Sequence, residues 1–260
     1  MRAAIDTRVV GIHLLATTLA AAGLALVVFG YWFPPGLREL AGGWKLFGLF
    51  VTGLLVCGPV LTALLYRTTK SRRALQVDVA FIGLLQMASL LYGLNALVQA
   101  RPLALVFETD RFRLITHADI PAQALPPLAA WIRPWSLDGP VMASVRGPLS
   151  DEERAQRFDD MLLDISPSQR PVYWLDIAHS TAQIRDRVRS LSDLRAAYPA
   201  QQAAIDQAVE RGRARAAGPA VNGGEHVWLP LVSRRNLEWV VFLDPLTMQA
   251  MAFLPLDGFI

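Results

Sequence analysis

The stretch ALQVDVAFIGLLQMASLLYGLNALVQARPLALVFETDRFRLIT, residues 74–116, decides the fold of this chain. The 22 residues between Asp78 and Arg101 include no Asp, Glu, Lys or Arg. At about 1.5 Å rise per residue, a helix of that length crosses a hydrocarbon core of about 30 Å. Arg101-Pro102 then places a charge and a helix-stopping residue at its end, and LALVFETDRFRLI follows with the composition of strands. The stretch predicts a membrane helix over residues 79–100 that leads almost directly into a folded aqueous domain.

Two more uncharged windows precede this helix, residues 9–37 and 46–66, and each is flanked by Arg or Lys. Pro34-Pro35-Gly36 should end the first helix near residue 33. The first apolar run is longer than the core of about 7–15 residues in a signal peptide, which favours a signal anchor that is not cleaved. We therefore predict a transmembrane region over residues 1–100 and a second domain over residues 101–260. The three helices should span approximately residues 9–33, 46–66 and 79–100.

Charge is divided unevenly between these two parts. Residues 1–100 hold 8 Lys and Arg against 3 Asp and Glu, whereas residues 101–260 hold 17 against 19. A protein that binds nucleic acid would need a positive face on its aqueous part. The composition therefore argues against nucleic acid as a partner.

The loops between the helices predict the topology. Four basic residues lie in the loop 67–78 and two lie in the loop 34–45. The positive-inside rule then places the amino terminus and the loop 67–78 in the cytoplasm. Because three crossings follow, residues 101–260 should lie outside it. In a bacterial cell this describes a multi-pass protein of the inner membrane with a periplasmic carboxyl-terminal domain.

The residues also argue against transport and catalysis. Pumps and ion-coupled transporters usually need ionisable groups within the membrane, and none of the three windows contains Asp, Glu, Lys or Arg. Cys57 is the only cysteine, so no intrachain disulfide can form. None of the four histidines belongs to an HExxH or GxSxG motif, and no P-loop or GxGxxG sequence occurs. We expect a protein that is not an enzyme and needs no cofactor or metal.

Strand and helix patterns share the second domain. Residues 103–120 predict two strands or one bent strand, and the proline-rich segment 118–148 predicts an extended surface connection. Short helices are expected between residues 179 and 215, and the residues after 226 predict an antiparallel meander of three strands. The expected fold class is membrane α, with three transmembrane helices, followed by an extracytoplasmic α+β domain.

One helix of this domain has a clear start. Ser150 and Glu153 have the spacing of a capping box, for a helix that runs to about residue 164. Apolar residues at helical spacing predict the side that this helix buries: Phe158, Met161, Leu162 and Ile165.

Polar residues of the third membrane helix are the first candidates for an interaction site: Gln86, Tyr92, Asn95 and Gln99. An amide in lipid is costly unless its hydrogen bonds are satisfied. Gln86 and Asn95 should therefore bond within the three-helix bundle or meet the membrane helix of another protein. Their separation of nine residues places them about 180° apart on an ideal helix, so they cannot share one narrow face.

Five charged residues at the membrane exit are the second candidate: Arg101, Glu108, Asp110, Arg111 and Arg113. They could form a solvated rim of the strands, where each surface pair contributes about 0–1 kcal/mol. They could instead dock near the lipid headgroups, where partial desolvation makes the loss of a partner more costly.

Four segments together resemble one family of known proteins: GGWKLFGLF (42–50), VCGPVLTALLY (56–66), DVAFIGLLQMASLLYGLNALVQARPLALVFETDRFRLI (78–115) and LPLVSRRNLEWVVFLDPLTMQAMAFLPLDGF (229–259). The family is that of the TfpX/TfpZ type IV pilin accessory proteins, also called FimB-like. QARP followed by FETDRFR is the most specific part of the resemblance.

The resemblance implies an inner-membrane protein of type IV pilus biogenesis that assists, stabilises or regulates pilin subunits before assembly, without catalysis. Its partners would be the lipid bilayer and the major pilin, through the membrane helix and the periplasmic head of that pilin. The chain is not itself expected to be a pilin, because its first apolar segment lacks the Gly-Phe-Thr-Leu-x-Glu processing pattern. The alternative is a membrane-anchored sensor or envelope-assembly factor whose outer domain binds another ligand.

Overall fold

The computed structural model describes residues 7–66, 70–121, 139–215 and 226–260. The chain forms two compact units. The first comprises residues 1–34 and 42–101, and the second comprises residues 35–41 and 102–260.

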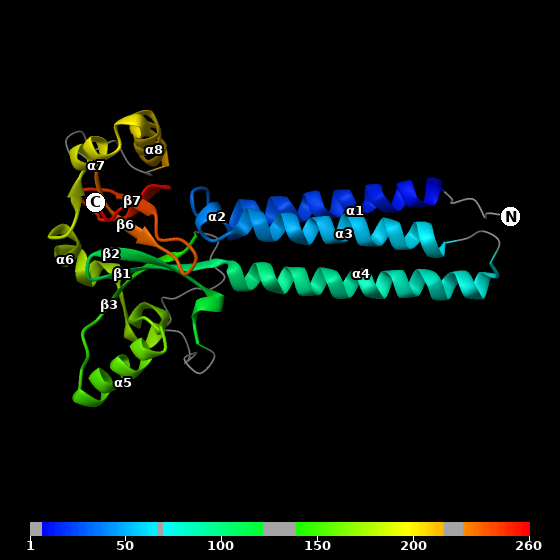
Figure 1. The fold of residues 1–260 in the computed structure, drawn as a ribbon, viewed down its shortest axis with the longest axis horizontal. Helices are drawn as coiled ribbons and strands as arrows, with labels where there is room; N and C mark the ends of the chain where they lie inside the picture. The colour runs from blue at the N-terminus through cyan, green and yellow to red at the C-terminus, as the bar shows by residue number, and fades with distance from the viewer. Residues whose placement is uncertain (1–6, 67–69, 122–138, 216–225) are drawn as a thin grey trace. The chain divides into compact units, whose positions relative to one another are not determined.

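Three long helices build the first unit and lie side by side (Figure 1). They are α1 (Thr7–Val27), which continues into the π-helical turn η1 (Val28–Trp32), α3 (Gly43–Leu65) and α4 (Arg72–Ala100). Each is long and apolar enough to cross a membrane, with spans of 26, 23 and 29 residues. The predicted three membrane helices are therefore confirmed. The last one begins earlier than the sequence indicated, because Ser71 caps it and its Oγ accepts a hydrogen bond from the Ala74 N–H at 3.3 Å.

One mixed sheet organises the second unit. Its strands are β1 (Pro102–Glu108), β2 (Arg111–Thr116), β3 (Val141–Val145), β4 (Trp174–Asp176), β5 (Arg189–Ser190), β6 (Val227–Val232), β7 (Trp239–Leu243) and β8 (Ala250–Leu254). They follow the order β4-β3-β1-β2-β6-β7-β8, and β5 pairs with β6. The pairs β1–β3 and β2–β6 are parallel, and the other pairs are antiparallel. The α+β class and the meander at the carboxyl end are confirmed.

The expectation of a surface connection over residues 118–148 is wrong for its last part. Residues 141–145 form β3, which pairs with β1 and buries Ala143 and Ser144 completely. The alternation in VMASV and its β-branched ends favour this strand, but the surrounding prolines hide it in the sequence. Residues 122–138 of the same segment lie outside the described residues.

Short helices and 3-10 turns complete the described part of this unit. They are α2 (Leu37–Leu40), α5 (Asp151–Leu162), α6 (Thr181–Arg185), α7 (Leu191–Ala197) and α8 (Gln202–Arg215), with 3-10 turns η2 (His117–Asp119), η4 (Pro167–Gln169), η5 (Pro171–Tyr173), η6 (Ile177–Ser180) and η7 (Pro199–Gln201). The helix expected from residue 179 is shorter than predicted, because Arg189 and Ser190 pair with β6. α7 and α8 share one hydrophobic core with β6, β7 and β8.

Helix α5 begins where the sequence predicts. The Ser150 Oγ accepts a hydrogen bond from the Glu153 N–H at 3.2 Å. The predicted buried side is wrong, however, because Phe158, Met161 and Leu162 are exposed and only Ile165 is half-buried. Charged residues that form ion pairs occupy the inner side instead.

Candidate interaction site

The predicted charged residues of the second unit lie on the hairpin of β1 and β2. A tight turn joins these strands, and Thr109 adopts a φ of 58° within it. Asp110 and Arg111 form a pair at the tip of this turn, with the Arg111 Nε 2.8 Å from the Asp110 Oδ1. The Arg111 guanidinium also lies 4.6 Å from the centroid of the Phe259 ring. Both side chains of the pair keep more than a third of their surface accessible, at 35% and 45%.

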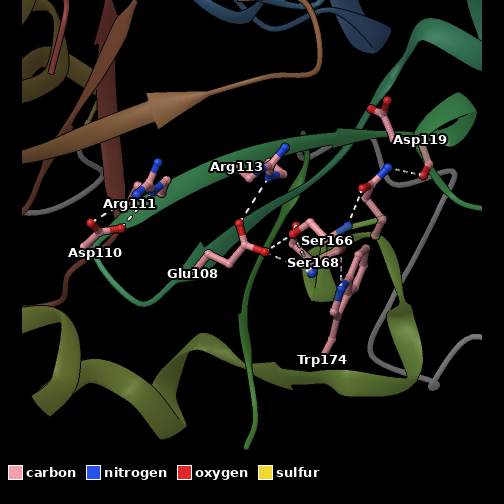
Figure 2. Close-up of polar contacts among 9 residues, drawn as sticks. Glu108, Asp110, Arg111, Arg113, Asp119, Ser166, Ser168 and Trp174 are labelled. Atoms are coloured by element: carbon pink, nitrogen blue, oxygen red, sulfur yellow. Dashed lines mark hydrogen bonds and ion pairs between the residues drawn. The ribbon is translucent and has the colours of Figure 1, made fainter. Parts of the chain in front are cut away.

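Glu108 and Arg113 form a second, less accessible pair. The Arg113 Nε donates to the Glu108 Oε2 at 3.1 Å. The Glu108 Oε1 accepts from the Ser166 Oγ and from the Ser168 N–H, the latter at 3.3 Å. Figure 2 shows Glu108 between Arg113 on one side and the two serines on the other. This carboxylate therefore ties the hairpin to the turn η4.

A chain of hydrogen bonds connects η4 to η2 and to β4. The Gln169 side chain accepts from the Ser166 N–H at 2.8 Å and donates to the Asp119 carbonyl at 2.9 Å. The Trp174 Nε1 donates to the Ser168 carbonyl at 2.8 Å, as Figure 2 shows. With its polar groups satisfied in this way, the network holds the hairpin, η2 and β4 together.

Sequence reasoning missed the residues of η4, because Ser166 lies 58 residues from Glu108. A local signal was nevertheless present in Ser166-Pro167-Ser168-Gln169. Ser at the cap, Pro at the first position and Gln three residues after Ser form a capping box, which the structure contains.

A cavity of about 440 Å³ opens beside this network. Its polar lining includes Arg113, Asp119, Gln169 and Arg234, and its apolar lining includes Ile120. Pockets for small molecules have volumes of about 300–1,000 Å³ and combine apolar walls with a few polar groups. The cavity falls within this range of volumes, but its lining is more polar than apolar.

In the membrane unit, Gln86 lies inside the bundle. Its Oε1 is 2.8 Å from the His13 Nε2, and its Nε2 donates to the Thr17 Oγ1 at 3.4 Å. The His13 Nδ1 lies 2.6 Å from the Thr62 Oγ1. Gly58 makes room for the amide, because a Cβ there would overlap with the Gln86 Nε2. The Gln86 amide thus bonds α4 to α1, and His13 links α1 in turn to Thr62 of α3.

The other three candidate residues of α4 form an outward stripe, which we define as Tyr92, Asn95 and Gln99. Their spacing of three and four residues places them on one face of the helix. All three are exposed, and their side chains have no hydrogen bond within the described part of the chain. Gln86 and Asn95 therefore have different surroundings, as their spacing requires.

The five predicted charges do not form one cluster. Asp110 pairs with Arg111, and Glu108 pairs with Arg113, whereas Arg101 belongs to the membrane unit. The Arg101 side chain is buried, and this burial lowers the pKa of its guanidinium below its ordinary value. Its backbone N–H donates to the Val98 carbonyl at 3.2 Å and ends α4.

The sequence also predicted that the chain holds no metal and is not an enzyme. Within the described residues, no three or more His, Cys, Asp or Glu side chains lie together as metal ligands would. The absence of enzymatic activity stays a prediction.

Comparisons with known proteins identify the family. A family model described as fimbrial assembly protein FimB matches residues 1–42. The chain is 31% identical to the fimbrial assembly protein of serogroup E1 from Dichelobacter nodosus, over 91% of this chain and 90% of the relative. It is 30% identical to the serogroup I protein of the same organism over the same shares. No solved structure matches this chain. The chain therefore belongs to the FimB family of fimbrial assembly proteins, as its sequence resemblance indicated.

Proposed function

We propose that this chain is an inner-membrane accessory protein of type IV pilus biogenesis that binds pilin subunits and stabilises or regulates them before assembly, without catalysis. Membership of the fimbrial assembly family supports a role in pilus formation. Three helices that can cross a membrane support the location. The proposed orientation keeps the amino terminus in the cytoplasm and the sheet domain in the periplasm, as the basic loop 67–78 indicates.

The observation that carries pilin binding is the outward stripe of α4. Lipid cannot satisfy the amides of Asn95 and Gln99, whereas the membrane helix of another protein can. A pilin that awaits assembly keeps an apolar helix in the bilayer and its head outside. Each hydrogen bond between membrane helices contributes about 0.6 kcal/mol on average, and up to about 1.7 kcal/mol. Three such contacts would give a reversible complex, which suits a subunit that must later be released.

Replacing the two amides separately tests this proposal. Asn95→Leu should leave the level of the protein unchanged and reduce the amount of major pilin that co-purifies with the tagged chain in detergent. Gln86→Leu should instead lower the protein level, because it removes hydrogen bonds inside the bundle. Normal pilin recovery with Asn95→Leu would exclude the stripe as the contact.

Reporter fusions test the orientation independently. A reporter that is active only outside the cytoplasm should be active after Ile260 and silent after Lys70. The reverse pattern would overturn the proposed topology and, with it, access of the sheet domain to a periplasmic pilin head.

The cavity beside Arg113 favours a second candidate function, that of a membrane-anchored sensor or envelope-assembly factor whose outer domain binds a small ligand. Ala118→Trp, at an exposed position of the lining, should fill the cavity and remove that ligand from the purified full chain, as measured by mass spectrometry of denatured extracts. Pilin recovery should be unaffected if the cavity serves only this second function.

A further inference from the structure

Helix α5 turns its charged side toward the domain. Glu153, Arg157 and Asp160 follow one another at spacings of four and three residues and share the inner face of the helix. Their side chains are only 16%, 14% and 4% accessible. The inner face of α5 is therefore polar, unlike that of an ordinary surface helix.

Ion pairs with distant residues hold this face in place. The Arg146 Nη1 lies 2.7 Å from the Glu153 Oε1, and the Arg157 Nη2 lies 2.6 Å from the same oxygen. The Arg157 guanidinium stacks 4.1 Å from the centroid of the Tyr173 ring. The Arg170 Nε donates to the Asp160 Oδ2 at 2.9 Å. Rotating the helix to bury its apolar side would leave these charges without partners, which is strongly unfavourable.

The opposite side of α5 is apolar and exposed. Phe158, Met161 and Leu162 lie on it with exposed fractions of 57%, 62% and 68%. The spacing of three and four residues from Phe158 to the other two places all of them on one side of the helix. We call these three residues the α5 face. Several large apolar side chains exposed together on a folded domain mark an interaction site.

Charge around the α5 face selects the kind of partner. Four carboxylates near it are exposed, those of Asp151, Glu152, Asp159 and Asp164. The one exposed cation of the helix, Arg154, is paired with Asp151. Anionic headgroups would be repelled by this border, and a second copy of α5 would bring like charges together. An apolar surface bordered by Lys or Arg on another protein fits it.

We propose that the α5 face is the docking surface for a pilin subunit, through an apolar patch with a basic border on that subunit. The identity of the partner rests on the proposed function, whereas the surface rests on the arrangement of α5. Apolar contact would supply the affinity, and the carboxylates would orient the subunit and speed its association.

Photo-crosslinking in cells that assemble pili tests the surface directly. A benzophenone amino acid replaces Phe158 in the full chain, and the matched control carries it at Leu246, which is equally exposed in the turn between β7 and β8. The expected result is an adduct with major pilin from position 158 and none from position 246. An adduct with lipid, an adduct between two copies of the chain, or equal pilin adducts from both positions would overturn the proposal.

Binding measurements with the full chain in detergent and purified major pilin provide the second test. Phe158→Asp should weaken binding at least tenfold, Asp159→Lys should weaken it severalfold at low salt, and Leu246→Asp should change it less than twofold. Unaltered binding by Phe158→Asp would refute the docking surface while pilin binding stands. No binding by the unmodified chain would refute the proposed function itself.

Discussion

Helices α8 and α5 have similar lengths and lie on two sides of the sheet (Figure 1). They differ in which face, apolar or charged, is turned toward the domain. α8 turns Ile205, Ala208 and Val209 into the core that it shares with β6, β7 and β8. α5 turns its ion-paired residues inward and leaves Phe158 outside. An amphipathic pattern shows that two faces differ, but it does not say which one is buried. The inner face is decided by the partners that the rest of the chain provides.

Truncating an apolar side chain should produce the largest difference between the two helices in the free energy of unfolding. Ile205→Ala should lower the free energy of unfolding of the domain by about 2–5 kcal/mol, because it leaves a cavity at a fully buried position. Phe158→Ala should change it by less than about 0.5 kcal/mol, because the ring is exposed. Urea titration of the full chain in detergent, followed by the fluorescence of the buried Trp228 and Trp239, measures both. Equal losses would mean that α5 buries its apolar side after all.

Removing a charged side chain should destabilise the domain more when it lies on α5 than when it lies on α8. Asp160→Ala in α5 should destabilise the domain by about 2–3 kcal/mol, since it leaves Arg170 half-buried without its partner. The matched change on α8, Asp206→Ala, breaks an exposed pair with Arg195 and should cost less than about 1 kcal/mol. The same urea titration compares them, and a smaller loss for Asp160→Ala would contradict the anchoring of α5.

The sequence predicted the start of α5 but not its orientation, and the reason is physical. Capping by Ser150 is local, so it is visible in the sequence. Arg146 and Arg170, which neutralise the inner face, lie outside the helix and come close only through the fold. Apolar periodicity alone therefore favoured the wrong side. β3 was missed for a related reason, because its pairing with β1 is not encoded locally.

The candidate site was also predictable only in its local features. The spacing of Gln86 and Asn95 required different surroundings for them, but it could not say which amide is internal. That choice depends on His13 and Thr62, which lie on two other helices. Likewise, the hairpin charges were visible as a group, whereas the partner of Glu108 on η4 was not.

The membrane unit offers a second case, after α5, of polar groups inside and apolar groups outside. The Gln86 Oε1 can only accept, so His13 must donate to it from Nε2. The Thr62 Oγ1 lies 2.6 Å from the His13 Nδ1, and its hydroxyl donates to the Gly58 carbonyl of its own helix at 3.0 Å. This arrangement resembles α5, in that buried polar groups fix which side faces outward.

Removing one hydroxyl from this network should have a moderate effect. Thr62→Val keeps the shape of the side chain and removes the hydroxyl beside the His13 Nδ1, so we expect a loss of about 0.6–1.7 kcal/mol. Thr18→Val is the matched control, because its exposed hydroxyl bonds only the Leu14 carbonyl of its own helix. Thermal unfolding in detergent should rank the two variants, and indistinguishable midpoints would exclude a stabilising role for the network.

α8 also makes a half-buried polar contact, and it provides the test with the smallest expected effect. The Arg213 Nε donates to the His226 Nε2 at 2.9 Å, so the imidazole must be neutral. Burial, and next the charge of Arg213, lower the pKa of His226 from its ordinary value of 6.5. Asp244 and Glu210 oppose this change with smaller effects.

Acidification should therefore weaken the α8 side of the domain slightly. The stabilising contribution of neutral His226 is complete above the ordinary pKa of 6.5, and it is lost as the pH falls toward the lower pKa of the folded state, because the unfolded chain binds the proton first. We expect a loss of less than about 1 kcal/mol between about pH 7 and pH 5 in urea titrations. His226→Gln keeps an acceptor for Arg213 but cannot be protonated, so it should flatten this dependence. A slope that persists in the variant would assign the pH response to other groups and leave the Arg213 contact with no measurable role.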